Sequence, residues 1–407
     1  MRGVSNGCCH MYKISEGRPE YKDDVIRMFW KAFEPTANLD ELREEDWTDY
    51  WNNQENDDFA YVALHHDKAV ANVSFFASTE NEIRGRPVKI AGVWGVATEP
   101  NHRRVGLVRR IFQQVFPRMR EEGMVLSILD PFYIPFYEKF GYAVAESRTR
   151  HQFNPREFRD IEEDSGLVSR ELTDPKESDL ILEVEKTMSR FGSRLFHFKR
   201  SVERAIKQNQ FYILEEGSEP VASVRFSVSR KNSNRHLKAY LSYFKSCEYF
   251  RPIVNLVSQY AVNSEQVIWY CDNQAPVRLF TKHHDAVTTQ EAGSMMMRVI
   301  DFEGYCRSIA VPETAEKGVH LTVKDEHCDW NSGTYELRPE GGRLECERVA
   351  PTSPEIKLDA LGISRVISGL NAPTTLRGLG LIDCSKQTAS KLEALFPPDN
   401  FVSYERF

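Results

Sequence analysis

The sequence lacks three features that would place it in common functional classes. No apolar run approaches the ~20 residues of a membrane-spanning helix, and the opening MRGVSNGCCHMYKISEGRPEYK has no apolar signal-peptide core. The eight cysteines form no spaced CxxC pair of a zinc site and no compact disulfide frame. Basic residues are not in excess, since 53 Lys and Arg stand against 60 Asp and Glu, giving a net charge of -7. We therefore expect a cytoplasmic protein with reduced thiols, and neither a membrane nor nucleic acid as a general partner.

Two small clusters of reactive residues could indicate a cysteine nucleophile or a metal site, but their surroundings in the sequence favour neither. Cys8 and Cys9 are adjacent in a leader at residues 1–11, which we expect to be disordered, and no histidine or acid is placed beside them. His283 and His284 precede Asp285, but adjacent side chains point apart. We expect solvated side chains there and predict no metal site.

The most informative stretch is GVWGVATEPNHRRVGLVRRIF, which runs from Gly92 to Phe112. Its apolar first half predicts a short strand that ends at Pro100. After Gly106 the apolar residues recur on one face of a helix, and Arg and Gln occupy the other face. The first N–H groups of a helix lack partners and carry the positive end of its dipole. The turn therefore predicts a site for a diphosphate.

Residues 12–155 alternate helices and strands around this motif, which predicts an α/β domain that closes near Pro155. We expect a helix at 23–33, strands at 59–63 and 69–76, the motif strand and helix, a strand ending at Asp130, a short helix between Pro135 and Gly141, and a strand at 142–145.

Residues 156–301 partly repeat that order without the Arg and Gly turn. The pattern predicts a helix at 179–191, strands at 210–214, 220–229 and 238–245, a helix at 253–261, a strand VIWYC, a further helix, and a strand MMMRVID whose methionines belong to the core. Two interpretations stay open, a second copy of the first fold that has lost cofactor binding and an unrelated α/β segment. Residues 302–407 then predict two strands around a turn at 331–333, followed by helices and a tail.

The motif carries a resemblance to a known family. The run Arg103 to Val108, RRVGLV, resembles motif A of the GNAT superfamily of acetyl-CoA-dependent N-acetyltransferases, written RxxGxG or RxxGxA, with Val108 in place of the last small residue. The longer run ATEPNHRRVGLVRRI is similar to the Eis-like (enhanced intracellular survival) acetyltransferases, which carry Pro-x-His-Arg-Arg-x-Gly-Leu. The alternative is an ordinary basic helix start in an α/β domain.

The resemblance also implies a fold for the whole chain. It implies an α/β (α+β) protein with tandem GNAT folds, the second degenerate, at 12–155 and 156–301. A sterol-carrier-protein-like α+β domain is implied at 302–407, with the signatures MMMRVIDFEGYC and VKDEHCDWNSGTYEL and a terminal aromatic residue.

Two catalytic residues are implied by the resemblance. Tyr137 in PFYEKFGY matches the tyrosine that protonates the departing thiolate, and Phe407 matches a terminal aromatic residue whose α-carboxylate accepts or orients the amine proton. An unperturbed phenol near pKa ~10 can protonate a thiolate of pKa ~8.5 at a cost of only about two kcal/mol. Tyr133 and Tyr142 are competing phenols, and simple packing is the alternative for each aromatic ring.

The family pattern also implies the contacts of acetyl-CoA. Strand residues Val96, Ala97 and Thr98 would lie against the pantetheine arm. The diphosphate would be held by Arg104, Val105, Gly106, Leu107, Val108 and Arg109. Phe132 and Tyr133 occupy the positions of a family Ser-Glu pair just ahead of the catalytic tyrosine.

These features together predict an acetyl-CoA-dependent N-acetyltransferase without a metal. The resemblance implies direct attack by a primary amine in a ternary complex, cationic acceptors such as aminoglycosides, polyamines or lysine side chains, and a homo-hexamer. Carboxylates that could line an acidic acceptor pocket are Glu34, Asp40, Glu41 and Glu405, although each is more simply explained as solvated. The alternatives are a lipid or sterol carrier and a regulatory protein that binds acetyl-CoA without turnover.

Overall fold

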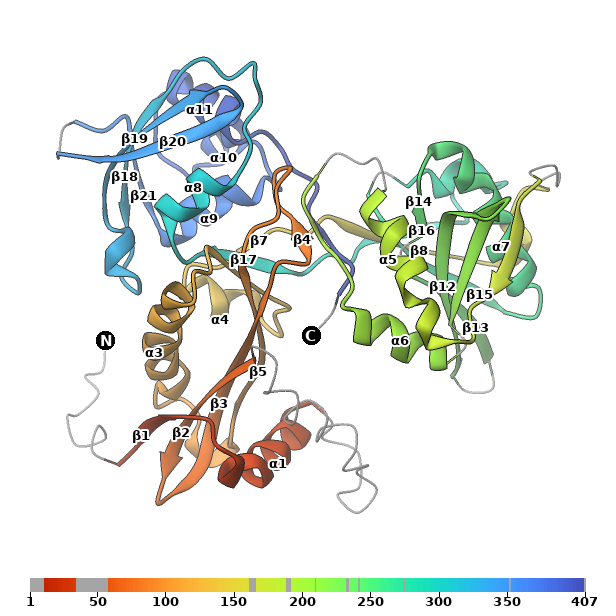
Figure 1. The fold of residues 1–407 in the computed structure, drawn as a ribbon, viewed down its shortest axis with the longest axis horizontal. Coiled ribbons are helices and arrows are strands. Elements are labelled where there is room, and N and C mark those ends of the chain that lie inside the picture. Colours follow the sequence, from red (N-terminus) through yellow and green to blue (C-terminus); the bar gives the residue numbers. More distant parts are fainter. Residues whose placement is uncertain are drawn as a thin grey trace.

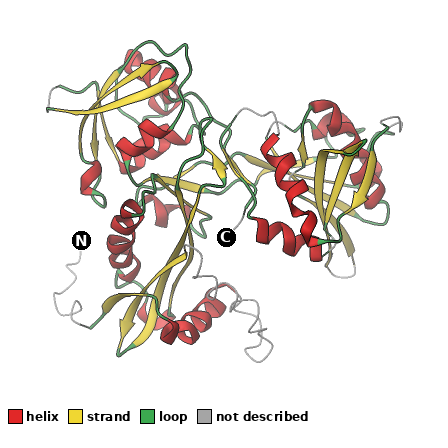
Figure 2. Cartoon of the chain, in the orientation of Figure 1, coloured by secondary structure: helices red, strands yellow, loops and turns green. Residues whose placement is uncertain are grey.

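The computed structural model describes residues 11–33, 58–160, 166–187, 192–208, 210–231, 234–240, 242–273, 275–350 and 353–405. These residues form a mixed α/β protein of three lobes (Figure 1), each built of a sheet and helices (Figure 2). None of the described helices is long and apolar enough to cross a membrane. The fold class agrees with the sequence prediction.

The first lobe is a seven-stranded sheet with the order β1-β2-β3-β5-β6-β17-β7. Its strands are β1 Lys13–Glu16, β2 Asp58–His65, β3 Lys68–Ser78, β5 Ile90–Thr98, β6 Leu126–Leu129, β7 Ala143–Val144 and β17 Met296–Val299, and its helices are α1 Lys22–Phe33, α3 Leu107–Glu121 and α4 Ile134–Glu138. Successive strand residues point to opposite faces, and the two long helices cover those faces. Val93 and Phe75 share a core with α3, whereas Trp94 and Phe76 share a core with α1.

The second lobe repeats this pairing order. Its strands run β9-β11-β12-β13-β15-β8-β16, and in both sheets the fourth and fifth strands are parallel while every other described pairing along these orders is antiparallel. The elements are β8 Arg148–Phe153, β9 Val168–Glu171, β11 Phe211–Glu216, β12 Glu219–Lys231, β13 Asn234–Ala239, β14 Tyr243–Phe244, β15 Gln266–Asp272, β16 Thr288–Glu291, α5 Ser178–Thr187, α6 Lys199–Lys207 and α7 Phe250–Ala261. The shared pattern supports a duplicated fold.

The two lobes exchange one strand each. β17 lies within residues 156–301, yet it pairs with β6 and β7 of the first sheet. β8 lies within residues 12–155, yet it pairs with β15 and β16 of the second sheet. The predicted boundaries near 155 and 301 therefore separate these two strands from the sheets that they complete.

The third lobe is a four-stranded sheet, β20-β19-β18-β21, with helices beside it. Its elements are α8 Phe302–Ser308, β18 Val319–Lys324, β19 Gly333–Glu340, β20 Arg343–Val349, β21 Ile356–Asp359, α9 Ala360–Ser368, α10 Pro373–Gly378 and α11 Lys386–Leu395. A small three-stranded sheet of β4 Asn81–Glu82, β10 Arg194–Leu195 and β22 Val402–Ser403 joins segments that are far apart in sequence. The lobes are thus connected by hydrogen-bonded backbone.

A buried ion pair connects the first lobe to the third. The Arg298 guanidinium on β17 donates to both carboxylate oxygens of Asp325, at 2.9 and 2.8 Å, and also to the Phe140 carbonyl. Gly141, at φ 82°, fits closely here, because an added Cβ would lie 2.7 Å from the Cβ of Ala360 on α9. These contacts hold the segment that follows α4 against the third lobe.

Two predictions for the second lobe are wrong in detail. The strand expected at 238–245 is two strands, β13 and β14, which pair at different positions along β12. The further helix expected after VIWYC is a single 3-10 turn, Val277–Phe280, within the described residues, and β16 follows it. A pattern of apolar residues does not specify strand partners, because these are set by distant parts of the chain.

His151 on the exchanged strand β8 provides a test of the exchange by pH. Its ring is 5% exposed between the hydroxyls of Thr149 and Thr289, and burial, with Arg278 nearby, lowers its pKa to about 4. The unfolded chain therefore binds a proton that the folded chain refuses between pH ~6.5 and ~4, so stability falls as the pH falls through this window. From pH 8 to pH 5 the wild type should lose about 1 to 2 kcal/mol more than His151→Gln in urea unfolding. Equal losses would contradict this placement of β8.

Candidate functional site

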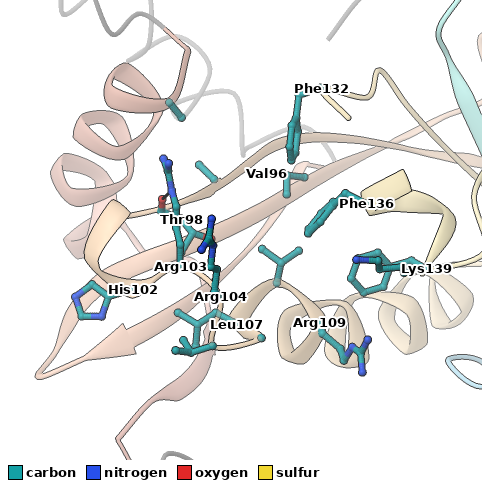
Figure 3. A pocket seen from close by; sticks show the side chains of 16 residues that line it. Val96, Thr98, His102, Arg103, Arg104, Leu107, Arg109, Phe132, Phe136 and Lys139 are labelled. Atoms are coloured by element: carbon teal, nitrogen blue, oxygen red, sulfur yellow. Dashed lines mark hydrogen bonds between the residues drawn. The ribbon is translucent and has the colours of Figure 1, made fainter. Parts of the chain in front are cut away.

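A cavity of about 780 Å³ lies where β5, the start of α3 and α4 meet. Figure 3 shows Phe132 and Phe136 beside Val96, with Arg103 and Arg104 at the turn. The lining is apolar near α4 and basic near the turn. It comprises Ala32, Val96, Ala97, Thr98, His102, Arg103, Arg104, Val105, Gly106, Leu107, Val108, Arg109, Phe132, Phe136, Lys139 and Phe140.

The turn before α3 has a backbone shape suited to an anion. After a short 3-10 turn, Pro100–His102, the chain places Arg104 at φ 64° and Gly106 at φ 82°, both in the left-handed region. The Arg103 Nε donates to the Thr98 carbonyl at 3.0 Å, which fixes the turn on the end of β5. Left-handed residues in a turn direct successive N–H groups into one concavity, which is a common anion site.

The start of α3 has no competing acid. Gly106 is its N-cap and offers no side-chain hydrogen bond, and the first turn holds no Asp or Glu. The first N–H groups of the helix therefore keep their capacity for an external acceptor. Arg104 and Arg109 are exposed on the cavity wall and add positive charge. An oxyanion would be stabilised here by both dipole and charge.

No such turn precedes the corresponding helix in the described residues of the second lobe. Its corresponding helix, α7, follows a 3-10 turn at Cys247–Tyr249 with Tyr249 in the right-handed region, and no left-handed residue occurs in the described stretch 242–250. The described part of the second lobe thus has the same sheet order and a helix in the corresponding place, without the left-handed turn.

β5 offers an open backbone edge inside the cavity. It pairs with β6 only over Ile90–Val93, because β6 ends at Leu129 while β5 continues to Thr98. On its other side β5 stays paired with β3, through a bulge where Gly95 adopts φ 60°. Over residues 96–98, the edge of β5 that faces away from β3 therefore has no strand partner in the described part of the chain, although the Thr98 carbonyl accepts from the Arg103 Nε. An extended ligand with amide groups can pair with such an edge.

Tyr137 lies directly behind the aromatic wall of the cavity. It is 2% exposed and is not among the lining residues. Its ring centroid lies 5.5 Å from that of Phe132 and 5.1 Å from that of Phe136, which both line the cavity. Burial raises the pKa of its phenol, and Tyr142 and Asp130 add to this effect. The phenol therefore stays protonated at neutral pH and has a proton to donate.

The competing phenols have other environments. The Tyr142 hydroxyl lies 2.7 Å from the Ser127 hydroxyl in the core and is 0% exposed. Tyr133 is the N-cap of α4, is 60% exposed, and does not line the cavity. Of the three tyrosines, Tyr137 has a ring that packs on the cavity-lining residues Phe132 and Phe136, and the hydroxyl that contacts Ser127 belongs to Tyr142.

The C-terminal segment is held firmly up to Glu405. β22 pairs with β10, and the Glu405 carboxylate accepts from the Phe198 N–H and the Ser201 hydroxyl, both at 2.8 Å. Glu405 is therefore occupied in fixing the segment and is only 6% exposed. Phe407 and the other candidate acids, Glu34, Asp40 and Glu41, lie outside the described residues.

The structure brings most of the predicted cofactor residues together. Ten of them line the one cavity: Val96, Ala97, Thr98, Arg104, Val105, Gly106, Leu107, Val108, Arg109 and Phe132. Sequence reasoning missed Ala32, Phe136, Lys139 and Phe140, which come from helices α1 and α4 and from the residues after α4. Their helical spacing placed them on those elements but gave no sign of a shared wall. His102 and Arg103 are part of the quoted motif and could have been included.

No group of three or more His, Cys, Asp or Glu residues that could hold a metal occurs in the described ranges. His283 is exposed, and its Nδ1 lies 2.9 Å from the Glu157 carboxylate, so it is a hydrogen-bond partner at the surface. The site contains hydrogen-bond donors, cations and a phenol.

Two family models match the chain. Residues 13–145 match a model described as an acetyltransferase (GNAT) domain, and residues 303–402 match one described as a sterol carrier protein domain. No curated protein matches the sequence.

Solved structures resemble the chain over nearly its whole length. A GCN5-related N-acetyltransferase from Anabaena variabilis superimposes with a TM-score of 0.83 at 16% identity, covering 97% of this chain and 100% of the other. One from Kribbella flavida gives 0.80 at 19% identity, covering 98% and 99%. Eis1 from Mycobacterium abscessus gives 0.75 at 16% identity, covering 97% and 100%. At these identities the likeness establishes the fold of all three lobes.

Proposed function

The chain carries an acetyltransferase domain of the GNAT family followed by a sterol carrier protein domain, and we propose that it transfers the acetyl group of acetyl-CoA to a primary amine. Both substrates would be bound together, and the amine would attack the thioester directly. The observation that carries this proposal is one cavity that joins a helix start without a side-chain cap to the part of β5 that extends beyond β6.

Each part of the cavity suits one part of acetyl-CoA. The N–H groups of the turn at Arg104 to Gly106 and of the start of α3 would hold the diphosphate, helped by the charges of Arg104 and Arg109. The β5 edge at Val96 to Thr98 would pair with the amides of the pantetheine arm. Phe132, which is 65% exposed, and Phe136 form the apolar wall beside that edge, where they would cover one side of the acetyl thioester.

The chemistry needs one proton donor and one acceptor. The neutral amine nitrogen forms a bond to the acetyl carbon, the carbon–sulfur bond breaks, and the thiolate must take up a proton. Tyr137 is the proposed donor, because its phenol stays protonated and its ring packs on the cavity wall. Its raised pKa makes the proton harder to give, but desolvation of a thiolate in the same site raises the thiol pKa as well. Phe407, the proposed acceptor or orienting group, stays a prediction from the resemblance.

The acceptor class is proposed at two levels. A small molecule or peptide with a primary amine is the broader proposal. The finer proposal, from resemblance, is a cationic acceptor such as an aminoglycoside, a polyamine or a lysine side chain. The homo-hexamer and the cytoplasmic location are predictions of the same origin.

The hollow found in the described part of the third lobe does not favour a lipid-carrier function. A hollow of about 420 Å³ between residues 316 and 355 is lined by charged groups, among them Glu316, Glu336, Arg338 and Glu355. An apolar ligand would leave those groups without water, at a considerable cost in free energy. We therefore rank the carrier function below acetyl transfer.

A thiol-release assay tests the proposal. The purified chain with acetyl-CoA should release CoA thiol only when an amine is added, and a panel of polyamines, aminoglycosides, free amino acids and lysine peptides should contain an acceptor. Mass spectrometry of the product should show one acetyl group on nitrogen. Tight binding of acetyl-CoA with no thiol release across the panel would instead indicate a regulatory binding protein.

A further inference from the structure

The short helix α4 carries Tyr137 and ends beside the third lobe. It has five residues, Ile134–Glu138, far fewer than a helix needs to be stable on its own in water. Its direction is therefore set by tertiary contacts, and these also set the place of the Tyr137 phenol. Contacts of this kind occur at the C-terminal end of the helix.

The turn after α4 is closed by its own backbone. The Tyr137 carbonyl accepts from the N–H groups of Phe140 and Tyr142, at 2.9 and 3.3 Å, and the Glu138 carbonyl accepts from the Gly141 N–H at 2.9 Å. Phe140 also lines the cavity at the start of α3. The turn thus connects Tyr137 to a residue of the cavity wall, so that a shift of the turn would move both.

The next two carbonyls of the turn accept from donors that the third lobe supplies or holds. The His327 Nε2 lies 3.0 Å from the Lys139 carbonyl, and since a carbonyl only accepts, this nitrogen carries the hydrogen. Arg298 of β17 donates to the Phe140 carbonyl, and its guanidinium is held by Asp325 at 2.9 and 2.8 Å. Both Asp325 and His327 belong to the loop between β18 and β19. These donors satisfy carbonyls at the end of a helix, where partners within the helix are missing.

One carboxylate orders this loop and the arginine together. The Oδ1 of Asp325 accepts from the N–H groups of His327 and Cys328, both at 3.0 Å, in addition to its bond with Arg298. The His327 ring packs on Phe140, with the ring centroids 5.4 Å apart. His327 is therefore held by the third lobe on one side and contacts a cavity-lining residue on the other.

Helix α9 of the third lobe adds two contacts to the same segment. The Nη2 of Arg365 lies 3.2 Å from the Oε1 of Glu138, the residue that follows Tyr137. Ala360 lies so close to Gly141 that a Cβ on this glycine would be 2.7 Å from the alanine Cβ. This close approach leaves the turn after α4 little room to move.

We infer that the third lobe is a positioning element for the proposed proton donor, and that His327 is a positioning residue that acts through Tyr137. With Asp325 and Arg365, it fixes the end of α4 and so keeps the Tyr137 hydroxyl in place relative to the thioester. Misplacement of a reacting group by about 1 Å can cost about 10²-fold in rate, so a helix this short needs such support. The inference deepens the proposed acetyl transfer and rests on it for the role of Tyr137. It gives the sterol carrier protein domain a part in the reaction that requires no lipid.

Hydrogen–deuterium exchange without substrates tests the contact itself. His327→Ala removes the donor to the Lys139 carbonyl. The N–H groups of residues 140–142 should then exchange about three- to tenfold faster, the effect of losing about one hydrogen bond. His327→Gln keeps an N–H donor and should stay within about twofold of the wild type. Unchanged exchange at residues 140–142 in His327→Ala would overturn the inference.

His320→Ala is the matched control. It removes the same ring from the same lobe, but His320 lies near the start of β18 and faces the hollow of about 420 Å³, whereas His327 follows the end of that strand. His320→Ala should change neither the exchange of residues 140–142 nor kcat. Equal effects of the two alanine variants would contradict a specific role of His327.

Turnover tests whether His327 acts through Tyr137. His327→Ala should lower kcat about three- to tenfold, and His327→Gln should restore it. The KM for acetyl-CoA should stay within about twofold, because the contacts proposed for the cofactor lie mainly on β5 and α3. In the Tyr137→Phe background, His327→Ala should lower kcat by less than about twofold, since the proton donor is already absent. Equal losses in both backgrounds would indicate general damage to the structure and would overturn the inference.

The two measurements distinguish failure of this inference from failure of the proposed function. If His327→Ala speeds exchange but no amine supports thiol release by the wild type, the third lobe holds α4 and acetyl transfer fails. If the wild type turns over acetyl-CoA and His327→Ala changes neither exchange nor kcat, acetyl transfer stands and the positioning role fails.

Discussion

Gly106→Glu should lower the affinity for acetyl-CoA by at least about 100-fold, as measured by calorimetric titration. Gly106 adopts φ 82° at the N-cap of α3, where a residue with a Cβ costs about 1 to 2 kcal/mol. An added Cβ would meet nothing within 4 Å, so the substitution begins in open space and not against a neighbouring atom. Its carboxylate would occupy the positive end of the helix and repel a diphosphate. Backbone strain, which favours other conformations of the free turn, and a repulsion of about 1 to 2 kcal/mol together reach the ~2.7 kcal/mol that a 100-fold loss requires.

Gly123→Glu is the matched control. Gly123 lies just past the other end of α3, adopts φ 77°, and also has nothing within 4 Å of an added Cβ. The Gly123→Glu substitution imposes a similar backbone strain and the same charge on the same helix, away from the cavity. The affinity of this variant for acetyl-CoA should stay within about threefold of that of the wild type. If both variants bind equally well, the turn does not hold the diphosphate.

Tyr137→Phe should lower kcat by about 10² to 10⁴, the usual range for loss of a general acid, with little change in acetyl-CoA affinity. The substitution keeps the ring contacts with Phe132 and Phe136 and removes only the hydroxyl. Because burial holds the pKa of this phenol above its ordinary value, the wild-type kcat should show no alkaline decline below about pH 10. Stopped thiol-release assays from pH 6 to about pH 10 would measure both effects.

The two competing tyrosines are the controls for that variant. Tyr142→Phe leaves the buried Ser127 hydroxyl without its partner at 2.7 Å, so it should lower stability by about 1 kcal/mol with kcat almost unchanged. Tyr133→Phe removes a hydroxyl from a ring that is 60% exposed and should change neither. If Tyr137→Phe kept full turnover while either control lost most of its kcat, the tyrosine replaced in that control would be the proton donor.

Local patterns predicted the elements around the cavity at the start of α3 well. Gly92 to Phe112 contains the strand, the turn and the amphipathic helix in one continuous run, so its geometry depends on neighbours in sequence. The left-handed φ of Gly106 is a local requirement that a glycine reveals. The left-handed φ of Arg104 is not revealed by its residue type.

Long-range arrangement could not be predicted in the same way. The exchanged strands β8 and β17 are short segments whose partner strands lie more than 100 residues away along the chain. The sequence of β8, RTRHQF, contains no pattern that identifies β15 and β16 as its partners. The clustering of charged residues could not be predicted either. Arg148, Arg225 and Lys238 are far apart in a sequence that is acidic overall, yet all three line a cavity of about 410 Å³. Only the folded sheet of the second lobe brings these three cations around one cavity.

The central claim is that backbone amides around Gly106 hold the diphosphate of acetyl-CoA. The most direct measurement is calorimetric titration of the wild-type chain with acetyl-CoA and, separately, with acetyl-pantetheine, which has the same thioester arm and no nucleotide diphosphate. The account predicts one acetyl-CoA site per chain with a dissociation constant of about 1 to 100 μM, and binding of acetyl-pantetheine at least about 100-fold weaker. No heat with acetyl-CoA, or equal affinity for the two compounds, would contradict it.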